Sequence, residues 1–153
     1  MSAGVAEGGC RCGQVRFSVS AAPLLTAACH CTGCQRMSSS AFSLSSSYPA
    51  AAFVVTEGEP VIGGMHGDNR HFCCPHCMSW MFNRPGALPN LVMVRTTMLD
   101  EPPAPPPFAE FYRGEGLPWA HTGAAHSFET APDLAGFQAL LAEYAATATK
   151  EAR

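Results

Sequence analysis

The sequence predicts a mainly β fold, a sandwich of short antiparallel strands that ends in one short C-terminal helix. The composition is one reason, because 47% hydrophobic residues against 14% charged residues can supply a core. A second reason is the content of turn formers, Gly 14 and Pro 13, which suits many short strands joined by turns. A third is the alternation of Val15, Phe17 and Val19 with polar neighbours, the period of a half-buried strand.

We expect residues 1–153 to form a single domain, because a chain of this length can bury a sufficient core by itself. Its core would span residues 8–100. The segment 101–107, EPPAPPP, cannot be helical and can donate few backbone hydrogen bonds, so it should run as an extended polyproline connector. Residues 108–153 would then form a tail that contains the C-terminal helix.

Short apolar segments, most of them bounded by Pro, Gly or Asn, predict the strands. The first, residues 14–20, directly follows a pair of cysteines. Four more are expected at residues 41–47, 52–56, 79–82 and 91–97. Their spacing indicates a meander or sandwich of antiparallel strands.

The C-terminal helix is predicted by apolar residues at helical spacing that follow Pro132 and Asp133. These apolar residues are Leu134, Phe137, Leu140, Leu141 and Tyr144. The carboxylate of Asp133 suits the positive end of the helix dipole. We expect the helix to pack on the sheet and residues 145–153 to fray.

The charge pattern excludes some classes of partner. With a net charge of −3 and no adjacent pair of Lys or Arg, the chain has no basic stripe for nucleic acid or an anionic membrane, so we expect neither partner. No apolar run reaches the length of about 18 residues that a membrane span needs. Residues 1–9 lack the cationic and apolar regions of a secretory signal, so we expect a cytoplasmic, reducing location.

The eight cysteines fall into three clusters, which read C-x-C, C-x-C-x-x-C and C-C-x-x-C. They are Cys10, Cys12, Cys29, Cys31, Cys34, Cys73, Cys74 and Cys77. Zinc prefers thiolates in tetrahedral sites, and ligands two or three residues apart let one tight turn place two sulfurs about 2.3 Å from the same ion. The clusters therefore predict bound zinc.

Two other interpretations of these cysteines exist. A disulfide framework would need an oxidising compartment, against which the N-terminal segment argues. A free cysteine can also be a small buried apolar residue, and we assign this role to Cys73. The reason is spacing, because Cys74 and Cys77 form the usual C-x-x-C knuckle whereas Cys73 is one residue too far from Cys77.

The remaining seven cysteines divide into four and three. A two-cysteine knuckle needs a second pair, which gives a closed structural zinc site of Cys10, Cys12, Cys74 and Cys77. The local triplet Cys29, Cys31 and Cys34 then holds a second zinc with three ligands. Three protein ligands leave one coordination position open, the feature that distinguishes catalytic from structural zinc.

The open site favours a soft ligand. Three thiolates and a divalent ion carry a net charge of −1, and a zinc centre with this charge activates bound water only weakly. It suits an incoming thiol instead, because the metal would lower the pKa of that thiol. His30 lies between two of the cysteines, but adjacent residues rarely aim at one ion. We therefore expect His30 to form hydrogen bonds beside the site, where it could assist proton transfer from the thiol.

The motifs GCRCGQVRF at residues 9–17, CHCTGCQR at 29–36 and CPHC at 74–77 resemble the glutathione-dependent formaldehyde-activating enzyme family, which includes the centromere protein V group. The resemblance covers residues 9–82, about half of the chain. It implies a tent of short β-strands and the same two zinc ions on the same cysteines. It also implies a carbon–sulfur lyase activity, the condensation of glutathione with formaldehyde, with a small-molecule thiol and aldehyde as partners.

The sequence departs from the family pattern at two places. Met78 follows the last knuckle cysteine where the family usually has glycine, and Ser38, Ser39 and Ser40 lack a glycine often found there. Because knuckle glycines permit positive φ, Met78 suggests a different turn at the structural site rather than a lost ligand.

Two alternatives to an enzyme stay open. In one, both clusters are structural and the protein is a non-catalytic zinc module that mediates protein interaction. In the other, the protein binds chromatin by analogy with centromere protein V, which the net charge of −3 disfavours.

Overall fold

The structure is a computed structural model that describes residues 4–64 and 66–151. The described residues form two compact units. One is drawn from residues up to Pro23 and from Ser45–Ala104, and the other from Leu24–Leu44 and from Pro105 onward. The expected single domain, with its core at 8–100, connector at 101–107 and tail at 108–153, stays a prediction.

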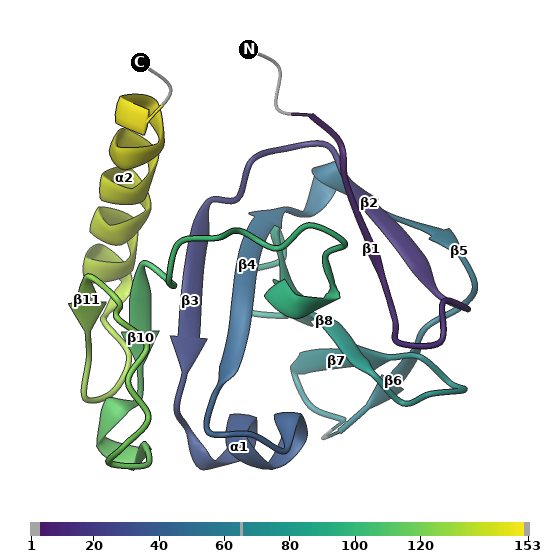
Figure 1. Cartoon of the computed structure of the whole chain (residues 1–153), viewed down its shortest axis with the longest axis horizontal. Helices are drawn as coiled ribbons and strands as arrows, with labels where there is room; N and C mark the ends of the chain where they lie inside the picture. Colours follow the sequence, from purple (N-terminus) through teal and green to yellow (C-terminus); the bar gives the residue numbers. More distant parts are fainter. Residues whose placement is uncertain (1–3, 65, 152–153) are drawn as a thin grey trace. The chain divides into compact units, whose positions relative to one another are not determined.

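The first unit contains two groups of antiparallel strands (Figure 1). The first group is a three-stranded sheet in the order β1-β2-β5, formed by Ala6–Gly9, Arg16–Val19 and Phe53–Glu57. The second group has the order β4-β9-β8-β7-β6, formed by Ser43–Pro49, Leu91–Arg95, Trp80–Pro85, Asn69–Cys73 and Val61–Gly63. Short 3-10 turns follow β4 and β9, at Ala50–Ala52 and Thr96–Met98.

Aromatic rings from both groups of strands pack together in the core of this unit. The Phe53 ring of β5 lies 5.3 Å from Phe17 of β2 and 4.7 Å from Phe82 of β8, measured between centroids. Val92 and Val94 of β9 are fully buried in the same cluster. The alternation in the sequence of β2 therefore has its physical cause here, because its inward residues contact the opposing strands.

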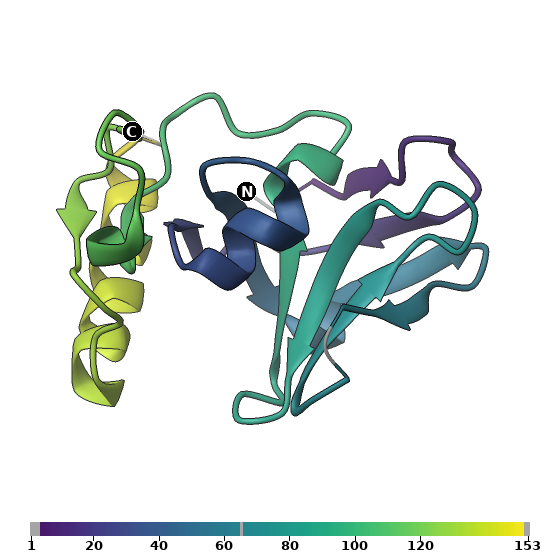
Figure 2. The same ribbon diagram turned by 90° about the horizontal axis from the view of Figure 1, so that it is seen from below.

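The second unit contains parallel strand pairs and both α-helices (Figure 1, Figure 2). Strand β10, Ala109–Phe111, pairs in parallel with β3, Leu25–Cys29, and with β11, His126–Ser127. The short helix α1, Thr32–Ser38, follows β3 after two residues, and a 3-10 turn at Arg113–Glu115 follows β10. The long helix α2, Leu134–Glu151, packs through Tyr144, whose ring lies 5.3 Å from that of Phe108.

The predicted fold class is confirmed. The chain is mainly β and carries a C-terminal helix, and each of the five predicted strands overlaps an observed one, namely β2, β4, β5, β8 and β9. The prediction that residues 145–153 fray is wrong for the described part, because α2 continues to Glu151. Its last turns are rich in alanine, the strongest helix former. Among the residues that the structure describes, none of the helices combines the length and the apolar character that crossing a bilayer requires.

Candidate metal centres

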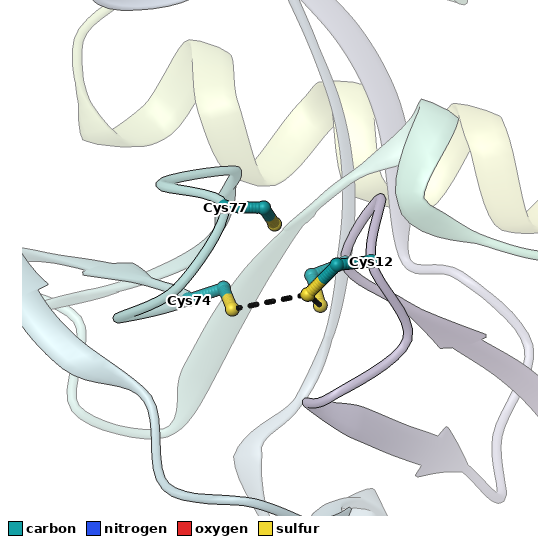
Figure 3. Close-up of side chains that lie close together, drawn as sticks. Cys12, Cys74 and Cys77 are labelled. Atoms are coloured by element: carbon teal, nitrogen blue, oxygen red, sulfur yellow. Dashed lines mark hydrogen bonds between the residues drawn. The ribbon is translucent and has the colours of Figure 1, made fainter.

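Two turns of the first unit bring four cysteine sulfurs together. Cys10 and Cys12 lie in the turn between β1 and β2, and Cys74 and Cys77 lie in the turn between β7 and β8. All four sulfurs are within 4.8 Å of one another. Figure 3 shows the side chains converging from the two turns, and the dashed line joins the sulfurs of Cys12 and Cys74, which are 3.8 Å apart.

The four sulfurs fit one zinc ion. A tetrahedral ion with zinc–sulfur bonds of about 2.3 Å requires sulfurs about 3.8 Å apart. The Sγ atoms of Cys10 and Cys12 are 3.5 Å apart, close to that value. Backbone amides also point at the sulfurs, since Val15 N–H donates to Cys10 Sγ at 3.3 Å and His76 N–H donates to Cys74 Sγ at 3.4 Å. Such hydrogen bonds stabilise negative charge on thiolates.

The electrostatics of this cluster also favour a cation. The Ser79 hydroxyl donates a hydrogen bond to the sulfur of Cys77 and lowers the pKa of Cys77 to about 5. The backbone at Gln14 lowers the pKa of Cys12, but burial and the three neighbouring sulfurs raise it to about 11. The pKa values of Cys12 and Cys77 therefore lie far apart, and a divalent cation is what would allow all four sulfurs to be thiolates together.

The turn after Cys77 differs from the prediction. Met78 has φ of 60°, the left-handed conformation that glycine favours, and its N–H donates to the Cys74 carbonyl at 3.0 Å. The expectation of a different turn is therefore wrong. The turn keeps the positive φ, and methionine adopts it at a local steric cost between its Cβ and the backbone, while its 62% exposed side chain adds no clash with other residues.

Replacing Met78 by glycine is expected to raise the free energy of unfolding by up to about 1 kcal/mol, because glycine adopts positive φ without steric cost. The gain is partly offset by the greater freedom of glycine in the unfolded chain. Chemical denaturation of the zinc-loaded protein measures the difference. Met78→Ala is the matched control, since it removes the exposed side chain but keeps Cβ, and a gain of equal size in this control would contradict the explanation.

A second cluster lies in the other unit. Cys29 is the last residue of β3, Cys31 is the N-cap of α1, and Cys34 lies in the first turn of α1. Their three sulfurs are within 4.8 Å of one another, and the Cys34 N–H donates to Cys31 Sγ at 3.3 Å. Within residues 4–64 and 66–151, no fourth His, Cys, Asp or Glu belongs to this group.

The extended backbone before α1 explains the C-x-C spacing. Successive side chains of an extended segment point to opposite sides, so Cys29 and Cys31 can share one side while His30 takes the other. The structure places His30 outside the sulfur group, fully buried, with its Nε2 atom 2.9 Å from the Oε2 atom of Glu110.

The three sulfurs also suit a soft divalent cation. The nearby sulfur of Cys34 and burial raise the pKa of Cys29, and burial raises the pKa of Cys31. Cys29 and Cys31 thus resist ionisation unless a positive charge is present. Zinc fits this donor set with three protein ligands and one further coordination position.

Cys73 lies outside both groups. It is the buried last residue of β7, and burial raises its pKa. Its sulfur packs against β6 so closely that a Cβ atom added to Gly63 would lie 2.8 Å from it. These features agree with the role of a small apolar residue.

Sequence reasoning missed the partners of the second cluster. Glu110 contacts His30, and Glu115 accepts hydrogen bonds from Thr32 at the start of α1. These acids are at least 80 residues away in the sequence. No spacing or periodicity connects them to the cysteines, so only the fold could identify them.

Comparison with known proteins agrees with this geometry. A family profile described as "Glutathione-dependent formaldehyde-activating enzyme" matches residues 5–115. No curated protein matches the chain. The crystal structure of a Rhodobacter sphaeroides protein is similar, with a TM-score of 0.52 and 18% identity over 64% of this chain and 91% of that chain, which shows a shared fold. The extent of the profile match establishes that this chain belongs to the glutathione-dependent formaldehyde-activating enzyme family.

Proposed function

We propose that the protein is a zinc-dependent carbon–sulfur lyase-like enzyme that condenses a low-molecular-weight thiol, such as glutathione, with formaldehyde or another small aldehyde. The family supports a glutathione-dependent, formaldehyde-activating role at the family level. The observation that carries the proposal is the contrast between the clusters, one with four sulfurs and one with three. We assign Cys10, Cys12, Cys74 and Cys77 to a structural zinc and Cys29, Cys31 and Cys34 to a catalytic zinc.

The proposed reaction is an addition. The thiol sulfur attacks the aldehyde carbon, a carbon–sulfur bond forms, and the carbonyl π bond breaks. The proton lost by the thiol ends on the former carbonyl oxygen, so glutathione and formaldehyde give S-hydroxymethylglutathione without any oxidant or reductant. The same path in reverse cleaves the adduct, which is the lyase direction.

The chain's own residues would supply binding and orientation. Zinc bound by the three cysteines would offer an open position to a thiol and lower the pKa of that thiol. Cys31 would be one of the three ligands, and it is held as the N-cap of α1, where its sulfur accepts the hydrogen bond from the Cys34 N–H. Holding the thiol in one place replaces a free encounter by an oriented one. The proposed compartment is the cytoplasm, where thiols stay reduced.

Exchange NMR with isotopically labelled formaldehyde tests the proposal. The condensation also proceeds without an enzyme, so the quantity to measure is the exchange rate above the buffer rate for zinc-loaded protein and for protein treated with a chelator. We expect acceleration with glutathione that the chelator removes. Cysteine, N-acetylcysteine and acetaldehyde in the same assay define which thiol and which aldehyde are used.

A zinc-loaded protein that accelerates none of these reactions would contradict the proposal. It would favour the alternative of a non-catalytic zinc module that mediates protein interaction. Zinc retention then distinguishes the two functions again, since a purely structural second site should hold its ion equally firmly with and without glutathione.

A further inference from the structure

A buried imidazole–carboxylate pair lies next to the three-cysteine cluster. The His30 side chain has no exposed surface, the Glu110 side chain is 11% exposed, and their Nε2 and Oε2 atoms are 2.9 Å apart. His30 is the residue between Cys29 and Cys31. The contact between its ring and Glu110 therefore restrains the segment that carries two of the three sulfurs.

The protonation state of Glu110 determines which of the two side chains donates this hydrogen bond. Burial raises the pKa of Glu110, but hydrogen bonds from Thr122, at 2.8 Å, and from His30 outweigh burial and leave the pKa below its usual value. The acid is therefore a carboxylate that accepts, and His30 donates from Nε2. The other ring nitrogen, Nδ1, is buried beside Gly116, where an added Cβ would lie 3.0 Å from it. Nδ1 has no hydrogen-bond partner among the described residues, so the hydrogen bond that holds the ring is at its Nε2 edge.

Further hydrogen bonds attach the cysteine turn to the same stretch of chain. The His30 N–H donates to the Phe111 carbonyl at 2.9 Å. The Gln35 side chain donates to the carbonyls of His30, at 2.7 Å, and Glu115, at 3.0 Å. Thr32 donates to Glu115 Oε1 from its N–H and from its hydroxyl, both at 3.1 Å. The stretch from Glu110 to Glu115 thus forms hydrogen bonds with His30, which follows β3, and with residues of α1.

These contacts bear on metal binding. Residues that orient metal ligands without contacting the ion commonly determine affinity, because they fix the ligands in the binding geometry beforehand. The turn itself is short, with two residues between β3 and α1, and its sulfurs are only partly buried. The one fully buried polar side chain within it is His30, and the partner of His30 is Glu110.

We propose that Glu110, acting through His30, is a positioning residue that holds Cys29 and Cys31 in the metal-binding geometry before the ion arrives. The proposal rests on the proposed function in taking the three cysteines as a metal site. It assigns no chemical step to Glu110 or His30.

The test compares Glu110→Ala and Glu110→Gln with wild type by competition between the protein and a chelator for zinc. We expect Glu110→Ala to weaken binding at the three-cysteine site by about 10- to 100-fold and to leave the four-cysteine site unchanged. Glu110→Gln keeps an acceptor oxygen but lacks the charge, so it should lose several-fold. Glu143→Ala and Glu143→Gln are matched controls, because Glu143 forms a similar 3.0 Å contact with His126 on the surface. These two control variants should leave the zinc affinity of both sites unchanged.

Two further readouts separate positioning from general stability. Proton NMR of the metal-free protein should show a slowly exchanging Nε2 proton of His30 in wild type and not in Glu110→Ala. Cobalt(II) placed at the second site should give an altered visible spectrum in Glu110→Ala, because that spectrum depends on ligand geometry.

A folded Glu110→Ala variant with unchanged zinc affinity and cobalt spectrum would overturn the proposal. If Glu110→Ala does not fold, unchanged affinity in Glu110→Gln would overturn it equally and leave Glu110 with a purely structural role. These measurements need no substrate, so an inactive enzyme with the expected affinities would refute the proposed function and support the positioning role.

Discussion

Replacing Cys77 by serine is expected to lower the free energy of unfolding by more than about 4 kcal/mol and to release the zinc of the four-cysteine cluster. Structural zinc contributes about 10–16 kcal/mol of apparent binding free energy in small zinc domains, and a neutral hydroxyl is a poor substitute for a thiolate. A domain has only about 5–15 kcal/mol of net stability, so this loss removes a large part of the stability of the first unit. Zinc analysis together with denaturant unfolding measures both effects.

Cys73 supplies the control for this experiment. It lies one residue before Cys74 and four residues before Cys77, but its sulfur belongs to neither cluster. Cys73→Ala removes one small buried group, and we expect a loss of about 1 kcal/mol with full retention of zinc. A Cys77→Ser variant that keeps its zinc and unfolds like Cys73→Ala would show that the four-cysteine cluster is no structural metal site.

Replacing Cys31 by serine is expected to reduce the thiol–aldehyde exchange rate to the buffer rate while leaving the chain folded. The loss follows because two remaining sulfurs hold a zinc ion much more weakly than three. The fold should survive because serine is among the best N-cap residues and its hydroxyl can accept the hydrogen bond that the Cys31 sulfur now accepts from Cys34. We expect the free energy of unfolding to change by less than about 1 kcal/mol.

The two serine variants should differ in which property they lose, and this difference distinguishes a structural from a catalytic zinc site. Cys77→Ser should lose stability, whereas Cys31→Ser should lose activity. Exchange NMR and denaturant unfolding on both proteins measure the pair. A Cys31→Ser variant with wild-type activity would remove the three-cysteine cluster from the reaction, and one that unfolds like Cys77→Ser would make that cluster structural.

Several local features of this protein were predictable from the sequence. The alternation at Val15, Phe17 and Val19 identified β2, because both the period and the buried face are contained in a few residues. The grouping of the cysteines was predictable for a related reason, since knuckle spacing limits which sulfurs one turn can bring together. Helix α1 was not predicted, because its seven residues are too few to show a helical period.

Features that depend on distant pairing were not predictable. Strands β10 and β11 have three and two residues, too few for a recognisable pattern, and β10 pairs in parallel with β3, which is far away in the sequence. The contact of Glu110 with His30 could not be predicted for the same reason. A single acid in a proline-rich neighbourhood has no signal until β10 is placed beside β3. The turn at Met78 was predicted wrongly because methionine adopts there, at a local steric cost, a conformation that glycine favours.

X-ray absorption at the zinc edge, with and without glutathione, tests most directly whether the three-cysteine cluster holds an open zinc that takes up a thiol. The account predicts that the average number of sulfur ligands per zinc rises when glutathione is added to the wild-type protein and stays constant in Cys31→Ser. An average that does not change on adding glutathione to fully loaded wild-type protein would contradict the account.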